Sequence, residues 1–176
     1  MTKRLVLIPL DGSDFSRQII GEVVKFINPE QNDLLLLRVE QQPAGLTGGP
    51  TRPASADVPV PMFETTQDAE YHAHPVYASQ ERDSLMANAT DEMQRDVARL
   101  QAVGYTVRTD VRFGHPAEEI LAAVASEPID LVAMTTHGRS GLNRLVMGSV
   151  AEHVLQHVSI PLMLLHAAAD SDVEQR

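Results

Sequence analysis

The chain has 176 residues, of which 43% are hydrophobic, 22% are charged and 4% are aromatic, and it contains no cysteine. Its formal net charge of −10 at pH 7 disfavours general binding of nucleic acids or anionic membranes, because both require a basic surface. The length suits a single domain with a real core, and the missing cysteine excludes disulfides and thiol catalysis. Because the sequence begins without the long apolar run of a signal peptide or membrane span, we expect a cytoplasmic protein.

The first 40 residues predict a strand, a helix and a second strand. The apolar run at residues 5–10 (LVLIPL) is typical of a strand buried on both faces of a parallel sheet, and Pro9 marks its carboxyl end because proline has no N–H for the ladder. A turn follows at residues 11–13. Apolar side chains then recur at helical spacing over residues 15–27, and residues 34–39 (LLLLRV) form a second buried run.

A long segment at residues 41–78 interrupts this pattern. It is rich in proline and glycine and shows no sustained hydrophobic period, so we predict a long loop or insertion within a single domain that spans residues 1–176. An amphipathic helix is predicted over residues 79–103. At residues 105–111 (YTVRTDV), Tyr105, Val107, Thr109 and Val111 alternate with the polar Thr106, Arg108 and Asp110. This alternation indicates a strand with one exposed face, near an edge of the sheet.

The remaining residues predict a helix, a strand, a helix and a strand. Pro116 opens a helix with two glutamates in its first turn, residues 130–136 form a buried strand, residues 148–158 a helix, and residues 161–166 (PLMLLH) the last strand. The tail at residues 167–176 is expected to be frayed. Five strands that alternate with four helices predict a doubly wound α/β fold, because parallel neighbours need helical crossovers.

The most informative stretch joins the strand at residues 130–136 to the helix at residues 148–158. Gly138 lies in the connecting loop, and Gly148 and Ser149 stand at the start of the helix. A strand, a glycine loop and a helix N-terminus direct unpaired N–H groups towards one point, which suits a phosphate group. The alternative is that the glycines only permit turns and that Ser149 only caps the helix. The stretch is neither a Walker loop nor a GxGxxG fingerprint.

The predicted topology brings a second segment to this loop. In a doubly wound sheet, ligands bind beyond the carboxyl ends of the strands, where the strand order reverses. If the first and fourth strands are neighbours at that point, Asp11 and the loop at residues 136–139 form one site. For Asp11, the alternative is a turn carboxylate that bonds its own backbone.

The chain resembles the universal stress protein family. The resemblance covers the N-terminal VLIPLDGS, the helix FSRQIIGEVVKFI and the C-terminal LVAMTTHGRSGLNRLVMGSVAEHVLQHVSIPLMLLH. The family's nucleotide-binding members carry Gly, two residues, Gly, nine residues, then Gly and Ser or Thr. Here Gly138, Gly148 and Ser149 fill the last three positions, and Thr135 stands at the first. The resemblance implies a Rossmann-like, open five-stranded parallel sheet in the order 3-2-1-4-5 with helices on both faces.

Carried onto this sequence, the resemblance implies an adenine-nucleotide site for ATP or AMP, with or without Mg²⁺. The resemblance implies that Asp11 contacts the adenosine moiety, that Pro9, Leu10 and Val39 form a wall against the base, and that Met134 and Thr135 form the floor of the pocket. It also implies that the phosphates are held by Gly138, Gly148, Ser149 and Val150, with His137 and Arg139 nearby. Ser13 would serve the site or cap the first helix. The resemblance also implies a homodimer that pairs through residues 161–166, an apolar edge strand that would otherwise favour aggregation.

Two histidine pairs are weak candidates for a zinc or nickel site. His153 and His157 lie four residues apart on a predicted helix with no evident third ligand, and His72 and His74 lie in the long segment. Exposed histidine pairs are usually solvated, so we favour no metal at either pair.

No catalytic set emerges, because the sequence has no nucleophile elbow, no His-Glu-x-x-His and no paired carboxylates near the glycine loop. We therefore predict an adenine-nucleotide-binding regulatory protein of the stress response that acts as a homodimer. One alternative is a nucleotide-free dimeric interaction protein that uses residues 41–78 to bind a protein partner, motivated by that segment's length and by Thr135. A weaker alternative is a slow ATPase or self-phosphorylating protein. No nucleic-acid or membrane partner is expected.

Overall fold

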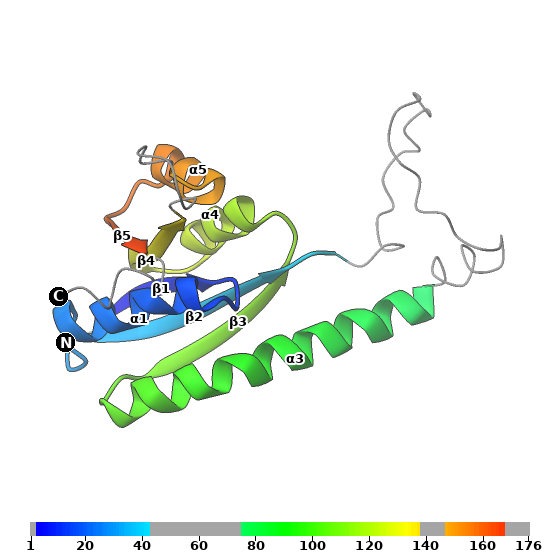
Figure 1. Cartoon of the computed structure of the whole chain (residues 1–176), viewed down its shortest axis with the longest axis horizontal. Coiled ribbons are helices and arrows are strands. Elements are labelled where there is room, and N and C mark those ends of the chain that lie inside the picture. Colours follow the sequence, from blue (N-terminus) through cyan, green and yellow to red (C-terminus); the bar gives the residue numbers. More distant parts are fainter. Residues whose placement is uncertain (1–2, 43–74, 138–146, 168–176) are drawn as a thin grey trace, which may run out of the picture. The chain divides into compact units, whose positions relative to one another are not determined.

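The computed structural model of the chain describes residues 3–42, 75–137 and 147–167. In chain order the elements are β1 (Arg4–Leu10), α1 (Asp14–Phe26), β2 (Asn32–Glu40), α3 (Pro75–Ala102), β3 (Val107–Phe113), α4 (Pro116–Ser126), β4 (Ile129–His137), α5 (Ser149–His157) and β5 (Leu162–Ala167) (Figure 1). Contacts within the chain define two units, residues 42–87 and the remainder. The sheet and every contact described below belong to the larger unit, and the smaller one is described only at residue 42 and in the first part of α3.

Each predicted strand and helix is present, with shifted ends. The helix predicted from residue 79 begins at Pro75, so the predicted loop at residues 41–78 was too long by four residues. Proline is favoured at the first position of a helix, where its missing N–H would have no partner. The strand predicted from Tyr105 begins at Val107. Residues 43–74 and 168–176, which carry the predicted insertion and most of the tail, lie outside the described residues.

The sheet is parallel and has the order β3-β2-β1-β4-β5, which confirms the predicted order. The central strand β1 pairs with β2 on one side, where Leu10 lies opposite Arg38, and with β4 on the other, where Leu7 lies opposite Val132. The chain leaves β1 towards one edge and returns to the other side at β4. The carboxyl ends of β1 and β4 therefore lie beside each other at the point where the strand order reverses.

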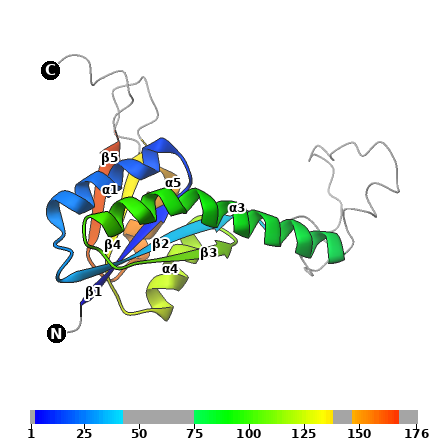
Figure 2. The ribbon, with the colours of Figure 1, turned by 90° about the horizontal axis from the view of Figure 1, so that it is seen from below.

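Helices cover both faces of the sheet, and successive residues of β1 explain how. Val6 and Ile8 belong to a core cluster formed with α1 and the C-terminal part of α3, whereas Leu5 and Leu7 belong to a second cluster formed with α4 and α5. Side chains of a strand alternate between its faces, so an uninterrupted apolar run is needed when both faces are buried. Figure 2 shows α1 and the C-terminal part of α3 over one face of the sheet.

Two local features hold α1 in place. Ser13 is its N-cap, and the Ser13 Oγ accepts a hydrogen bond from the Ser16 N–H at 3.1 Å. At the other end, the buried Tyr105 hydroxyl donates to the carbonyl oxygen of Ile27 and lies 3.3 Å from that of Val23. Burial raises the pKa of Tyr105 above 10.0, because the interior disfavours a phenolate.

Among the helices in the described ranges, none is both long and apolar enough to cross a membrane. The cytoplasmic location stays a prediction from the sequence.

Candidate functional site

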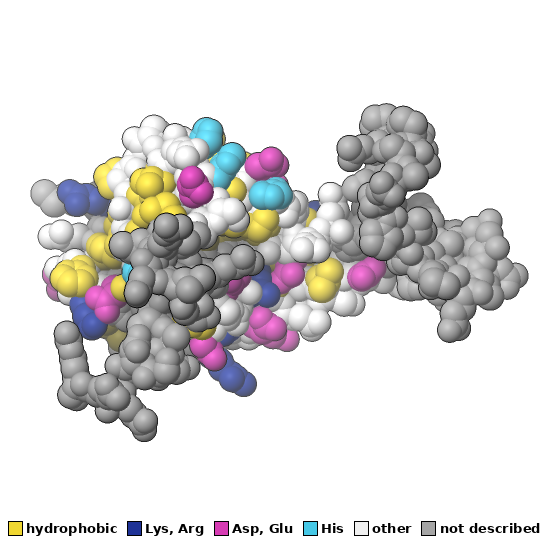
Figure 3. All heavy atoms as spheres, turned by 45° about the horizontal axis from the view of Figure 1, so that its top comes forward, with side chains coloured by type: hydrophobic (Ala, Val, Ile, Leu, Met, Phe, Trp, Pro, Cys, Tyr) yellow, Lys and Arg dark blue, Asp and Glu magenta, His cyan; other side chains and the backbone are white. Residues whose placement is uncertain are grey.

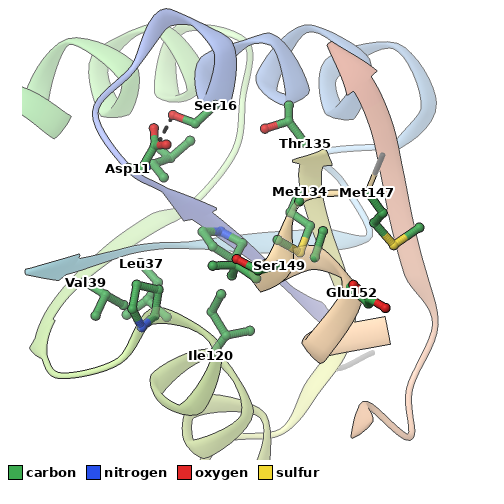
Figure 4. Close-up of a pocket in the computed structure, with 16 residues that line it drawn as sticks. Asp11, Ser16, Leu37, Val39, Ile120, Met134, Thr135, Met147, Ser149 and Glu152 are labelled. Carbon is green, nitrogen blue, oxygen red and sulfur yellow. Dashed lines mark hydrogen bonds between the residues drawn. The ribbon is translucent and has the colours of Figure 1, made fainter. Parts of the chain in front are cut away.

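A cavity of about 630 Å³ lies where the carboxyl ends of β1 and β4 meet the start of α5 (Figure 4). Nine of the residues predicted for the site line this cavity, namely Pro9, Leu10, Asp11, Val39, Met134, Thr135, Gly148, Ser149 and Val150. A cavity of this size is typical of a site for a small molecule or cofactor. The fold therefore brings together residues that are more than 120 positions apart in the chain, at the strand reversal where ligands bind in this architecture.

The Asp11 carboxylate is held in place by the turn that follows β1. Its Oδ1 accepts hydrogen bonds from the N–H of Ser13 at 2.9 Å and from the Ser13 Oγ at 2.6 Å. The Ser16 hydroxyl lies 3.3 Å from the Asp11 N–H and donates to the Ser13 carbonyl oxygen at 2.9 Å. Figure 4 shows Asp11 and Ser16 side by side at one end of the cavity. Both readings of Asp11 made from the sequence are thus compatible, since the side chain bonds the turn and also lines the cavity.

The N-terminus of α5 also lines the cavity. Gly148 is the N-cap, with φ −63° and ψ 146°, and as a glycine it has no side chain with which to cap the helix. Ser149 is the first helical residue, so the alternative that Ser149 caps the helix is wrong. The first N–H groups of a helix have no partner within it, and they carry the positive end of its dipole. Gly148, Ser149, Val150 and Ala151 all line the cavity, so this part of it suits an anion.

Apolar side chains form part of the cavity wall. Leu37 and Val39 of β2, Ile120 of α4 and Met134 of β4 line it, and Figure 4 shows their side chains around the open space. Thr135, only 8% exposed, adds a hydroxyl group at the end of β4. A cavity lined by apolar side chains, a carboxylate and a helix N-terminus suits a flat heterocycle that carries a hydroxylated sugar and a phosphate.

Four residues predicted for the site are not part of the described cavity. Ser13 caps α1 and is not among the lining residues. His137 is the last residue of β4, and its side chain is outside the described part of the structure. Gly138 and Arg139 lie outside the described residues, so their place in the site stays a prediction.

Seven lining residues were missed by the sequence-based prediction, and they are Ser16, Leu37, Pro116, Ile120, Met147, Ala151 and Glu152. Several of them carried a usable signal. Leu37 is two residues before Val39 and therefore shares its face of β2. Met147 and Ala151 adjoin the predicted Gly148 to Val150 stretch. Pro116 and Ile120 carried none, because only the crossover of α4 brings them to the cavity.

The histidine pair on α5 is exposed, and the rings of His153 and His157 stack with their centroids 4.3 Å apart. The His157 Nδ1 lies 2.8 Å from the carbonyl oxygen of His153. Figure 3 shows histidine side chains on the surface of the layer that contains α5. Within the described ranges, no three His, Cys, Asp or Glu side chains are grouped as a metal site would need. His72 and His74 lie outside the described residues.

A family model decides the relationship of this chain to known proteins. The model of the universal stress protein family matches residues 3–166. The chain belongs to the universal stress protein family. Universal stress protein MJ0577 of Methanocaldococcus jannaschii is 29% identical over 84 residues, which cover 48% of this chain and 52% of that protein. The chain thus matches about half the length of this curated relative.

Solved structures of universal stress proteins have the same fold. That of MJ0577 has a TM-score of 0.67 at 20% identity and covers 96% of this chain and 99% of that chain. A family protein of Arabidopsis thaliana solved with AMP bound has a TM-score of 0.61 at 15% identity, covering 98% and 97%. A universal stress protein solved in complex with cAMP has a TM-score of 0.55 at 16% identity, covering 96% and 100%. These likenesses confirm the predicted fold of this chain.

Proposed function

We propose that this universal stress protein binds an adenine nucleotide, ATP or AMP, in the cavity between Asp11 and the N-terminus of α5, and that nucleotide occupancy regulates its interactions during stress. The observation that carries the proposal is the cavity itself, whose lining combines the Asp11 carboxylate, held by Ser13, with the first residues of helix α5. Asp11 would accept hydrogen bonds from ribose hydroxyls, because a carboxylate is an acceptor only. The N–H groups of Ser149 and Val150 would donate to phosphate oxygens.

The charge of the cavity bears on which nucleotide binds. Glu152, in the first turn of α5, lines the same cavity, which therefore has a second carboxylate in addition to that of Asp11. A triphosphate would bring further negative charge, which Mg²⁺ would offset, whereas AMP needs less compensation. Solved family members with bound AMP or cAMP support an adenine nucleotide as the class of ligand.

The first test asks whether the purified protein carries a nucleotide and binds one after its removal. Heating should release an adenine nucleotide, and calorimetry of the stripped protein should show one site per chain for ATP or AMP. Absence of both, at nucleotide concentrations up to the millimolar range, would exclude the proposal.

The second test changes Gly148. Its φ of −63° is accessible to any residue, so Gly148→Ala and Gly148→Val should both fold. The added side chains should keep the phosphate away from the N–H groups. Because a hydrogen bond to a charged group is worth about 1.5–3 kcal/mol, the loss of two should weaken binding about a hundredfold or more for valine, and less for alanine. Equal affinities in the wild type and both variants would place the phosphate elsewhere.

We further propose that the protein is a homodimer paired through β5. This strand lies at one edge of the sheet, and its N–H and C=O groups on that side have no strand partner among the described residues. An apolar edge strand favours pairing with another chain. Light scattering at micromolar concentration should give the mass of two chains, and the mass of one chain would contradict the dimer.

A further inference from the structure

Two arginines hold the turn that carries Asp11. Arg17 comes from α1 and Arg38 from β2, and both side chains are largely buried, at 30% and 15% exposed. Neither residue lines the cavity. Both contact Gly12, the residue directly after Asp11, and both also pair with carboxylates of α3.

Arg17 bonds the backbone of the turn. Its Nη1 donates to the carbonyl oxygen of Gly12 at 2.6 Å, and its Nε donates to Asp96 Oδ2 at 3.1 Å. Asp96, on α3, is only 8% exposed. A buried carboxylate requires a charged or hydrogen-bonding partner, so Arg17 and Asp96 hold each other in place. The guanidinium group therefore links α3 to the Gly12 carbonyl oxygen.

Arg38 lies against the other side of the turn. It is opposite Leu10, the last residue of β1, in the register of the sheet. A Cβ atom added to Gly12 would overlap its guanidinium group, whose Cζ would be 2.9 Å away, so Arg38 packs directly on the Gly12 backbone. Its Nε donates to Glu40 Oε1 at 2.7 Å, and its Nη1 lies 3.9 Å from Glu92 Oε2 of α3. Arg38 thus also joins the turn to α3.

The contact between α1 and α3 at this level is polar. A hollow there is lined only by charged residues, which are Asp14, Arg17, Asp91, Glu92, Arg95 and Asp96. Among and beyond these residues of α3, Met93, Val97 and Leu100 belong to the apolar core. The ion pairs can therefore be loosened while the core keeps α3 attached, because apolar packing does not depend on them.

We propose that Arg17 and Arg38, held by Asp96 and Glu92 of α3, are positioning residues of the nucleotide site. They fix the Gly12 peptide and so the direction of the Asp11 carboxylate, which makes nucleotide affinity depend on the ion pairs to α3. This inference rests on the proposed function. Since these ion pairs are partly hydrated, salt screens them, and the positioning weakens as ionic strength rises.

The test uses the full chain and substitutions that keep side-chain size. Asp96→Asn removes the charge that holds Arg17, and Glu92→Gln removes the one beside Arg38. Glu92 is 55% exposed, so its variant should fold even if Asp96→Asn does not. Glu22→Gln is the matched control, because it removes one charge and the Glu22–Lys25 ion pair of α1 without touching the turn.

Calorimetry with ATP and amide hydrogen exchange give independent readouts. We expect Asp96→Asn to weaken ATP binding about tenfold, a size typical of coupling through a network, and Glu92→Gln by less. Exchange should quicken at the amides of Ser13 and Ser16, whose hydrogen bonds define the turn. Arg38→Lys should retain part of the affinity that Arg38→Met loses, and Glu22→Gln should match the wild type.

The outcomes separate the two proposals. If the wild type binds ATP and both α3 variants bind it within twofold, the positioning role is wrong and the proposed function stands. If the wild type binds no nucleotide, the proposed function fails. Amide hydrogen exchange then tests only whether the ion pairs position the turn. Unchanged protection of the Ser13 and Ser16 amides in folded Asp96→Asn or Glu92→Gln would overturn that positioning role.

Discussion

Replacing Gly12 by alanine should destabilise the protein, whereas the same change at Gly21 should stabilise it. Gly12 has φ +84°, a left-handed conformation that costs an L-residue about 1–2 kcal/mol. The new methyl group would also overlap the Arg38 guanidinium group, which must move away from Glu40 at a cost of about 1 kcal/mol. We expect the free energy of unfolding to fall by about 2–3 kcal/mol.

Gly21 provides the matched control because it lies inside α1 and a Cβ added there meets no atom within 4 Å. Alanine is favoured over glycine in a helix by about 0.5–1 kcal/mol, so Gly21→Ala should raise the free energy of unfolding by about that amount. Urea unfolding followed by circular dichroism measures both variants. Changes of the same sign, or a Gly12→Ala protein as stable as the wild type, would refute the description of the turn. Nucleotide affinity should fall for Gly12→Ala only.

Further predictions concern the core and pH. Leu100→Ala should lower the free energy of unfolding, measured in urea, by about 2–5 kcal/mol because Leu100 is fully buried. Val103→Ala, at an exposed position, should change it by no more than about 0.5 kcal/mol. Equal effects of the two substitutions would contradict the packing of α3. Tyr105→Phe should cost about 1 kcal/mol at neutral pH through its lost hydrogen bonds. The unfolded chain loses the Tyr105 proton near pH 10.0, whereas the folded chain keeps it to higher pH because its pKa is raised. The free energy of unfolding of the wild type should therefore decrease above pH 10.0. The phenylalanine variant should lack the contribution of Tyr105 to this decrease.

The fold could be predicted from the sequence because its strongest signals are local. The apolar runs at residues 5–10 of β1 and 34–37 of β2 have no polar interruption, which is typical of strands covered on both faces. The alternation of side chains at residues 105–111 indicated an edge strand, and β3 lies at one edge of the sheet. The start of α3 was missed because the composition before residue 79 is typical of a loop, although Pro75 suits the first position of a helix.

The candidate site could be predicted only where a motif marked it. Asp11 and the stretch from Gly148 to Val150 stand at a turn and at a helix start, and both line the cavity. Ile120 has no such mark, since it reads from the sequence as an ordinary core residue of α4. Arg17 and Arg38 carry no motif either, because the carboxylates of α3 that pair with them lie far away in the chain.

The central claim is that an adenine nucleotide binds between Asp11 and the N-terminus of α5. Titration of ATP or AMP into isotope-labelled protein, followed by nuclear magnetic resonance, tests it most directly. Backbone amide shifts should move at residues 10–13 and 148–151, with little change along the exposed strand β3. Shifts that cluster away from both segments, or none at millimolar nucleotide, would contradict the claim.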